Sequence, residues 1–347
     1  MNQLHYRNLG KSGLKVSEIC LGTWHLKPLI GERDAGGIVK VDEKGSLEIM
    51  ERAFDLGVNF IDTSDRYHGT SHLSPLAYVG FAEKLVGKFL QGRREDVVLC
   101  TKVRGKMGEG PNDEGLSRVH IMQGFKHSLE RLKTDYVDLY LAHWPDVSTP
   151  IEETLRAFDD LVRWGKVHYI GVSNFSVWQI MSALQISERE GLEKFVACQN
   201  LYNMLERQAE IELLPFARAY GVGVFSYSSL AQGLLTGKYR EGTEPPKGSR
   251  ATYVKKGEWS KYFTKRKFRI VEELRGIAEE KNVSLAQLSI AWLLGKPGIS
   301  CVSISATSIE QIEENIGAVD VKITPDDEKR INEVISPIVA SDKYPLL

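Results

Sequence analysis

Eight short runs of apolar and β-branched residues, alternating with amphipathic segments, are the feature that most constrains the fold of this chain. The runs are largely apolar along their length, as expected of strands that are covered on both faces. Their alternation with helical segments is typical of parallel strands joined by crossover helices. The predicted strands are Val16–Leu21, Asn59–Thr63, Val97–Val103, Val137–His143, Tyr169–Ser173, Val196–Leu201, Val222–Tyr227 and Cys301–Ser305.

Between these runs, apolar residues recur at helical spacing, and several segments carry start or stop signals. Gly57 and Gly165 follow two of the segments as C-cap candidates. Ser176, and either Thr307 or Ser308, offer N-cap oxygens to two others. Examples of the predicted helices are Ser46–Leu56, His120–Leu132, Ile151–Trp164, Val177–Arg189 and Ser308–Ala318.

The number of strand and helix units favours a closed barrel. Eight units over about 300 residues suit a (β/α)₈ barrel better than an open doubly wound sheet. With 347 residues, 42% of them hydrophobic, the chain is long enough to bury the core of such a barrel. We find no internal repeat or interdomain linker, so we predict a single (β/α)₈ TIM-barrel domain over residues 1–347. The longest irregular stretches are predicted to be extended βα loops: Lys27–Asp42, Thr70–Tyr78 and Arg240–Lys261.

The charge balance argues against nucleic acid and membranes as partners. With 45 basic and 46 acidic residues the net charge is -1, so no overall field attracts polyanions. No stretch approaches the roughly 18 uninterrupted apolar residues of a membrane span. Four dispersed cysteines suit free thiols in a reducing compartment. We therefore expect a cytoplasmic protein that acts on a small molecule, and its oligomeric state stays open.

Two weaker features are assigned to ordinary structure. His68 and His72 have the spacing of helical metal ligands, but Gly69 and Thr70 between them favour a loop, so we predict no metal site. Basic residues at 255–256 and 265–267 surround aromatic ones. We interpret this patch as a solvated helix start rather than a nucleic-acid surface.

Polar side chains that core packing does not require stand at the ends of three successive predicted strands. Asp62 and Tyr67 follow the second strand, Lys102 lies on the third, and His143 ends the fourth. In barrels of this kind the carboxyl ends of the strands carry the chemistry. A free phenol titrates at about 10, and a nearby ammonium lowers that value by stabilising the phenolate. These four residues therefore predict a proton-transfer site.

In this site Tyr67 would donate the proton, Lys102 would lower the pKa of its phenol, and Asp62 would keep Lys102 charged. His143 would hydrogen-bond the carbonyl oxygen of a substrate. Taken singly, each residue also has a structural interpretation. Asp62 can cap a turn, Lys102 can form a buried ion pair with it, His143 can be a core histidine, and Tyr67 a surface aromatic. Their occurrence together at successive strand ends favours catalysis.

The motifs around these residues resemble those of the aldo-keto reductase superfamily. The sequence GVNFIDTSDRY over residues 57–67 is similar to the signature of that family. Four further blocks agree with it in the family's order: CTK at 100–102, DLYLAHWP at 138–145, IGVSNF at 170–175 and YSSLAQGL at 227–234. The resemblance covers nearly the whole chain. Within the superfamily, the chain resembles a branch that contains general bacterial and archaeal aldo-keto reductases and oxidoreductases similar to channel β subunits.

The resemblance implies reduction of aldehydes or ketones, or the reverse reaction, with hydride from a reduced nicotinamide and a proton from Tyr67. Ser173, Asn174 and Gln199 would bind the carboxamide, and Tyr227 would stack on the nicotinamide ring. These residues can also simply cap strand ends. The implied cofactor set is Thr23, Trp24, Asp62, Ser173, Asn174, Gln199, Tyr227, Ser228, Ser229, Leu230, Gln232, Lys238, Arg250, Thr307, Gln311, Glu314 and Asn315. The substrate pocket would be lined by Trp24, Tyr67, His143 and Trp144.

The adenosine end departs from the better-known family pattern. Many relatives have a lysine or arginine near the start of the last helix, where this chain reads SATS at 305–308. The helix N-terminus there is itself suited to a phosphate. Arg250 resembles an arginine that some branches fold over the cofactor, and Thr307, Gln311, Glu314 and Asn315 match a branch that binds the adenosine with polar side chains. We therefore predict NADP, with NAD as the alternative. No GxGxxG motif follows any predicted strand, so a Rossmann fold finds no support.

Two other functions compete with carbonyl reduction. A barrel lyase could use Lys102 to form a Schiff base, but it would leave the nicotinamide-binding blocks unexplained. A regulatory or redox-sensing subunit that keeps a cofactor is the other alternative, because one branch of the family is similar to channel-associated β subunits. The four candidate catalytic residues are intact, which favours an enzyme. The physiological substrate and the favoured direction of reaction stay open.

Overall fold

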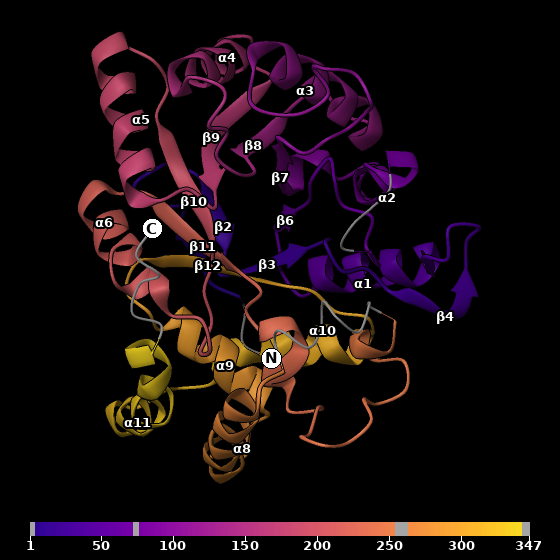
Figure 1. The fold of residues 1–347 in the computed structure, drawn as a ribbon, viewed down its shortest axis with the longest axis vertical. Coiled ribbons are helices and arrows are strands. Elements are labelled where there is room, and N and C mark those ends of the chain that lie inside the picture. The colour runs from indigo at the N-terminus through magenta and orange to yellow at the C-terminus, as the bar shows by residue number, and fades with distance from the viewer. Residues whose placement is uncertain (1–3, 72–75, 254–262, 342–347) are drawn as a thin grey trace.

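The protein forms a closed barrel of eight parallel strands surrounded by helices (Figure 1). The structure, a computed structural model, describes residues 4–71, 76–253 and 263–341. Around the barrel the strands follow one another in chain order, and the last pairs with the first. The strands are β3 (Ile19–Gly22), β6 (Phe60–Asp62), β7 (Val98–Val103), β8 (Val137–Ala142), β9 (Val167–Ser173), β10 (Phe195–Leu201), β11 (Gly223–Tyr227) and β12 (Ile299–Ile304). The predicted (β/α)₈ barrel is confirmed.

Among the described residues, a crossover helix follows each barrel strand, and two further helices pack together beside the barrel. The crossover helices are α1 (Glu43–Asp55), α2 (Phe81–Phe89), α3 (Arg118–Leu132), α4 (Ile151–Arg163), α5 (Val177–Glu190), α6 (Leu213–Tyr220), α9 (Leu285–Leu294) and α10 (Ile309–Ile316). The additional pair is α8 (Lys265–Glu280) and α11 (Pro325–Ser341).

The predicted helix boundaries have the expected local chemistry. Gly57 and Gly165 adopt positive φ directly after α1 and α4, the conformation that ends a helix at little cost for glycine. Ser176 forms a capping box with Gln179 at the start of α5. Of the two candidates before α10, Ser308 is the N-cap, since its hydroxyl accepts the backbone N–H of Gln311.

The prediction of one continuous strand at Val16–Leu21 is wrong. The structure divides residues 16–21 between β2 (Lys15–Ser17), which pairs with β1 (Tyr6–Asn8), and barrel strand β3. The division falls at Glu18. Next to it, the Ser17 hydroxyl donates to the Ile19 carbonyl and the Ser17 N–H donates to the Asn59 side chain. These local bonds replace a continuous strand ladder.

The long loops contain structure that the sequence did not predict. An antiparallel hairpin of β4 (Pro28–Arg33) and β5 (Val39–Val41) occupies the stretch from Lys27 to Asp42. The loop before α2 contains a short 3₁₀ helix at residues 76–78, and His72 lies outside the described residues. The end of the loop predicted at Arg240–Lys261, including the basic pair at 255–256, also lies outside them. The other basic cluster begins α8, as predicted, with Thr264 as its N-cap.

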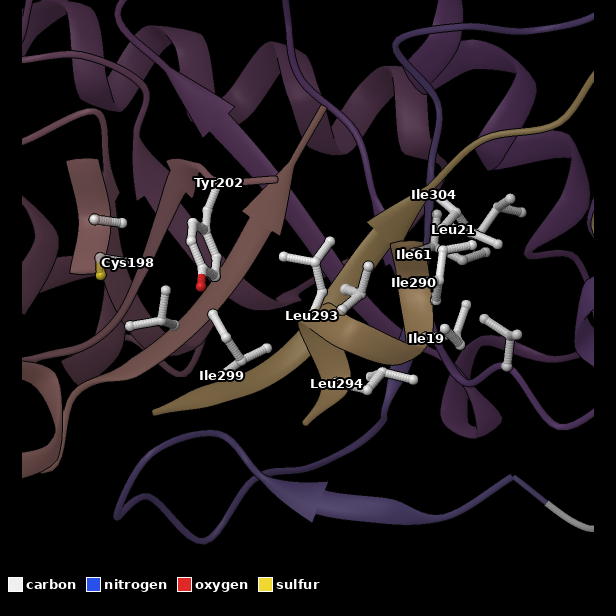
Figure 2. Packing of buried hydrophobic residues seen from close by; sticks show 14 of the residues in the cluster. Ile19, Leu21, Ile61, Cys198, Tyr202, Ile290, Leu293, Leu294, Ile299 and Ile304 are labelled. Atoms are coloured by element: carbon white, nitrogen blue, oxygen red, sulfur yellow. The ribbon is translucent and has the colours of Figure 1, made fainter. Parts of the chain in front are cut away.

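Two apolar layers hold the barrel together. Inside it, side chains such as Cys20, Phe60 and Phe225 fill the interior, and the two phenylalanine rings lie 5.3 Å apart. Outside it, the helices pack on the strands. Figure 2 shows Ile290 and Leu293 of α9 beside Ile299 and Ile304 of β12. Both layers fix the strands, so the polar side chains at the strand ends are held on a rigid frame.

Within the described residues, no helix combines the length and apolar character that a bilayer span requires. The same residues contain no cluster of three or more histidine, cysteine, aspartate or glutamate side chains arranged to hold a metal ion. All four cysteines are buried free thiols.

Candidate active site

The four predicted catalytic residues lie at the carboxyl ends of adjacent strands. Asp62 ends β6, Lys102 lies near the end of β7, and His143 directly follows β8. Tyr67 lies in the loop that follows β6. Because parallel strands end at the same rim of the barrel, residues separated by up to about 80 positions are brought together.

Lys102 is the centre of this group. Its side chain is fully buried, and its ammonium donates to Asp62 Oδ1 at 2.6 Å, to the Thr63 carbonyl at 2.8 Å and to Tyr67 Oη at 3.1 Å. Three partners use all three donors of an ammonium group. Burial alone would lower the pKa of Lys102, but Asp62 and Tyr67 together raise it above its usual value. Lys102 is therefore a charged group that points at the phenol.

Tyr67 has a higher pKa than the sequence predicted. Lys102 lowers the pKa of the phenol as expected, but burial raises it by more, and Asp62 adds to the increase. The predicted net lowering is therefore wrong for this structure. The physical reason is that a buried phenolate loses its hydration, and one shared ammonium does not fully replace that loss. Tyr67 is consequently protonated at neutral pH, which is the state that donates a proton.

His143 is a neutral imidazole beside Tyr67. Burial lowers its pKa well below the usual value, and Lys102 and nearby arginines lower it further. The rings of His143 and Tyr67 meet edge to face with centroids 5.6 Å apart. Trp144 stacks on the other side, with a centroid distance of 3.7 Å, and is 41% exposed. Trp144 therefore lies on the solvent-exposed side of this group. The sequence predicted that it lines the substrate pocket.

Gln199 joins this group by a contact that the sequence did not reveal. Its side-chain amide, on β10, donates to Asp62 Oδ2 at 3.0 Å. Lys102 already occupies Oδ1, so both carboxylate oxygens are satisfied and the Asp62 side chain is fixed. Thr23 adds a further restraint, since its backbone N–H and hydroxyl both donate to the Asp62 carbonyl.

Asn174 links the ends of β8, β9 and β11. Its side-chain amide donates to the His143 carbonyl and to Ser173 Oγ, both at 3.0 Å. Its oxygen accepts the hydroxyl of Tyr227 at 2.8 Å. Asn174 has a φ of +62°, a conformation that asparagine tolerates better than most residues. The predicted carboxamide-binding residues and the predicted stacking tyrosine therefore form one connected set.

The turn after β11 has an unusual run of left-handed conformations. Ser228, Ala231 and Gln232 have φ values of +57°, +47° and +60°. Such turns can direct successive backbone N–H groups to one side, which suits an anion. Two bonds hold the turn: Ser229 Oγ donates to the Ser303 carbonyl at 2.7 Å, and Gln232 Nε2 donates to Ser228 Oγ at 3.0 Å.

A pocket opens beside this turn. It is lined by Leu201, Asn203, Glu206, Tyr227, Ser228, Ala231, Gln232, Leu234 and Lys267. The side chain of Leu230 is partly buried against the core next to it. The side chain of Lys238 is exposed, and its pKa is lowered by partial loss of hydration and by the neighbouring Arg250 charge.

Arg250 and Trp24 meet across the mouth of the barrel. The guanidinium carbon of Arg250 lies 4.1 Å from the centre of the Trp24 ring, a cation–π geometry. Near this pair, Tyr253 Oη and His25 Nε2 are 3.0 Å apart. The segment at 250–253 therefore touches the loop that follows β3.

The predicted adenosine-binding residues form a separate group on α10. Gln311 Oε1 accepts the backbone N–H of Thr307 at 2.9 Å and its hydroxyl at 3.1 Å. Asn315 is buried, whereas Glu314 is exposed. The side chain of Gln311 is thus engaged in capping the chain before the helix.

Two residues of the site were present in the quoted signature but received no role. Ser64 Oγ lies 3.2 Å from His143 Nδ1, and it donates to Asp65 Oδ1 at 2.9 Å. Their signal in the sequence is a pair of small polar residues between Asp62 and Tyr67. Only the fold shows that Ser64 reaches His143 and links it to Asp65.

Comparison with known proteins identifies the family of this barrel. Residues 18–336 match the family model described as the Aldo/keto reductase family. The chain belongs to the aldo/keto reductase family. Family membership supports an oxidoreductase activity, and this family generally binds NADP(H).

Individual relatives of this aldo/keto reductase have names of two kinds. It is 39% identical over 338 residues to a probable voltage-gated potassium channel subunit beta of Arabidopsis thaliana, covering 96% of this chain and 97% of that protein. It is 36% identical over 341 residues to the uncharacterized oxidoreductase YrpG of Bacillus subtilis, covering 95% and 96%. A putative channel subunit beta of Schizosaccharomyces pombe is 37% identical, with 95% and 93% covered.

Proposed function

We propose that this aldo/keto reductase uses NADPH to reduce aldehydes or ketones to alcohols, or catalyses the reverse reaction, with Tyr67 as the general acid and base. The observation that supports this most directly is the direction of one hydrogen bond. Lys102 donates to Tyr67 Oη, so the phenol's own proton is left to donate elsewhere. That arrangement suits transfer of a proton to a carbonyl oxygen.

The other residues have matching roles in the proposal. As Tyr67 loses its proton, Lys102 stabilises the phenolate that forms, because its charge is already aimed at the oxygen. Asp62, held by Gln199, keeps Lys102 charged and in place. His143 and Trp144 orient the carbonyl oxygen and the group that carries it.

The strand ends fit a nicotinamide dinucleotide. Ser173, Asn174 and Tyr227 are joined by hydrogen bonds at the rim beside His143. The turn after β11 is suited to an anion, and Gln232 Oε1 is buried without a partner among the described residues. When bound there, a reduced nicotinamide supplies the hydride. The chain's own residues would bind it, orient the carbonyl and provide the proton.

We propose NADP as the preferred dinucleotide and NAD as the weaker one. Ser308 and Thr307 stand at the N-terminus of α10, where backbone N–H groups favour a phosphate. The Arg250 side chain, packed on Trp24, would add a cation near the bound dinucleotide.

A Schiff-base lyase is less well supported. Its nucleophile must be a neutral amine, whereas Asp62 and Tyr67 raise the pKa of Lys102 and keep it charged. A regulatory subunit is the second candidate, and the names of two relatives as potassium channel β subunits favour it. Such a subunit would bind the same dinucleotide but reduce carbonyls poorly.

The test is a binding titration followed by a substrate panel. Quenching of tryptophan fluorescence by NADPH and by NADH measures both affinities, and we expect NADPH to bind more tightly. Oxidation of NADPH is then followed with aliphatic, sugar and aromatic aldehydes. Turnover of any of them supports the reductase. Tight binding without turnover across the panel would favour the regulatory subunit, and absence of binding by either dinucleotide would overturn the proposal.

A further inference from the structure

Behind His143 lies a short buried chain of polar groups. Ser64 Oγ is 3.2 Å from His143 Nδ1 and 2.9 Å from Asp65 Oδ1. All three residues are buried, and Asp65 is only 1% exposed. Because Nδ1 is the nitrogen that faces Ser64, the other ring nitrogen, Nε2, is the one left for a substrate. The direction of the hydrogen bond between Ser64 and Nδ1 therefore affects whether Nε2 carries a proton.

Asp65 has a poor environment for a carboxylate. Its Oδ2 atom is buried without a hydrogen-bond partner among the residues that the structure describes. An ionised carboxylate with one unpaired buried oxygen is costly. Burial raises the pKa of Asp65 to about 7, and the Glu83 charge adds to the increase.

Charged and polar groups from several elements surround Asp65. Glu83, on α2, is held by Thr101 and by Arg131 of α3. Arg131, together with Arg66 in the same loop as Asp65, lowers the pKa of Asp65, but by less than burial raises it. From β8, Tyr140 contributes a neutral hydroxyl, because burial keeps its pKa well above the usual value. The charge of Asp65 therefore changes near neutral pH.

The hydroxyl of Ser64 has one proton, so the two contacts that it makes depend on each other. When Asp65 is protonated, it can donate to Ser64 Oγ, and Ser64 then donates to His143 Nδ1. The neutral imidazole must carry its proton on Nε2. When Asp65 is ionised, Ser64 donates to the carboxylate instead. His143 then donates from Nδ1 to Ser64, and Nε2 retains only a lone pair.

We propose that Asp65 is a positioning residue which, through Ser64, decides which ring nitrogen of His143 carries the proton. Loss of one proton from Asp65 to solvent reverses both hydrogen bonds and moves the imidazole proton from Nε2 to Nδ1. This inference rests on the proposed function, in which Nε2–H donates to the carbonyl oxygen. Carbonyl reduction is then supported by protonated Asp65 and suppressed as Asp65 ionises.

The direct test reads the tautomer and does not depend on turnover. Ring ¹⁵N chemical shifts of His143, assigned with His143→Gln, are followed across neutral pH with the full-length protein. We expect the wild type to change from the Nε2–H to the Nδ1–H form with a midpoint near 7. Asp65→Asn, whose amide donates at every pH, should keep the Nε2–H form throughout. A single tautomer at all pH values in the wild type would overturn the proposal.

Variants of Ser64 separate the relay from a general structural effect. Ser64→Ala removes the hydroxyl and should abolish the pH-dependent change, whereas Ser64→Thr keeps the hydroxyl and should preserve it. An unchanged tautomer switch in Ser64→Ala would contradict a role for Ser64.

The kinetic counterpart is the pH profile of carbonyl reduction. In the wild type, kcat/KM should fall by about tenfold per pH unit above the midpoint. The break should disappear in Asp65→Asn. A tautomer switch in a protein that reduces no carbonyl would support the relay and contradict the proposed function instead. A wild-type break that persists unchanged in Asp65→Asn would contradict the relay alone.

Discussion

Lys102 illustrates how a single residue can have a structural and a catalytic role at once. A lysine in an apolar strand needs a partner, and Asp62 provides it at 2.6 Å. Lys102 therefore does form the buried ion pair with Asp62 that the structural interpretation predicted. The same ammonium also reaches Tyr67 Oη, and only that second contact relates it to chemistry. Because a buried charge costs free energy unless it is paired, few side chains can replace Lys102.

Lys102→Met is expected to reduce both activity and stability. It removes the charge that stabilises the phenolate, so kcat/KM should fall on the order of 10²-fold or more. It also leaves the Asp62 carboxylate buried and unpaired, which costs about 3 to 5 kcal/mol. Urea denaturation and steady-state kinetics measure the two effects.

The double variant Asp62→Asn/Lys102→Met is the control. Because it removes both charges, much of the lost stability should return while activity stays low. Recovery of activity together with stability would show that Lys102 has only a structural role.

Asp65 gives a prediction about stability and pH. Its pKa is raised from the ordinary value near 4 to about 7 in the folded protein. The folded state therefore binds more protons than the unfolded state between these values, so this group's contribution to stability falls as pH rises through that window. Asp65→Asn does not lose stability in this way, because asparagine does not titrate. The free energy of unfolding of the wild type, relative to Asp65→Asn, should fall by about 2 to 4 kcal/mol from pH 4 to pH 8. A constant difference across that range would contradict the buried, strained carboxylate.

At the level of elements, the sequence predicts what periodicity and local signals encode. The apolar runs give the positions of the barrel strands, and caps such as Ser176 and Gly165 give helix ends. Helix α9 shows no amphipathic face because nine of its ten residues are buried. In the hairpin, the residues of β4 are mostly exposed and show no apolar alternation, and β5 alternates over only three residues, too few to predict a strand. The interruption between β2 and β3 lies next to Ser17, whose N–H donates to the Asn59 side chain 42 positions away.

Gly171 tests how closely the strands pack. A Cβ at this position of β9 would lie 2.5 Å from the Ala197 carbonyl oxygen of β10 and 2.7 Å from a Leu141 methyl group. Gly171→Ala should therefore force the strands apart and destabilise the protein by roughly 2 to 4 kcal/mol. It should also weaken dinucleotide binding, because Ser173 and Asn174 end the same strand. Thermal unfolding measures the first effect.

Gly276 in α8 is the matched control. A Cβ there meets nothing within 4 Å, so Gly276→Ala should stabilise the helix by up to about 1 kcal/mol. Equal destabilisation by the two substitutions would contradict the packing argument.

On the scale of the whole molecule, the site exists only when the barrel is closed. Residues of β6, β7 and β10 meet through hydrogen bonds between positions as far apart as Asp62 and Gln199, and His143 after β8 joins them through Ser64. No spacing in the sequence encodes such a contact. The sequence therefore predicts which residues act, largely through the family signature. It does not predict that Gln199 holds Asp62, that Asn174 holds Tyr227, or that burial dominates the pKa of Tyr67.

Dinucleotide binding should stabilise the whole fold, because the proposed contacts come from several strands. NADPH at about 100 times its Kd should add about 2.7 kcal/mol to the free energy of unfolding. At equal concentrations, NADPH should raise Tm more than NADH does. Equal or absent shifts would contradict the proposed preference or the proposed site, respectively.

The central claim is that Tyr67 gives its proton to a carbonyl oxygen while Lys102 stabilises the phenolate left behind. Its most direct test is Tyr67→Phe, measured for NADPH affinity and for carbonyl reduction in the same preparation. We predict a dinucleotide Kd within roughly twofold of the wild type and a loss of kcat/KM on the order of 10²-fold or more. Reduction that continues at the wild-type rate in Tyr67→Phe would contradict the account.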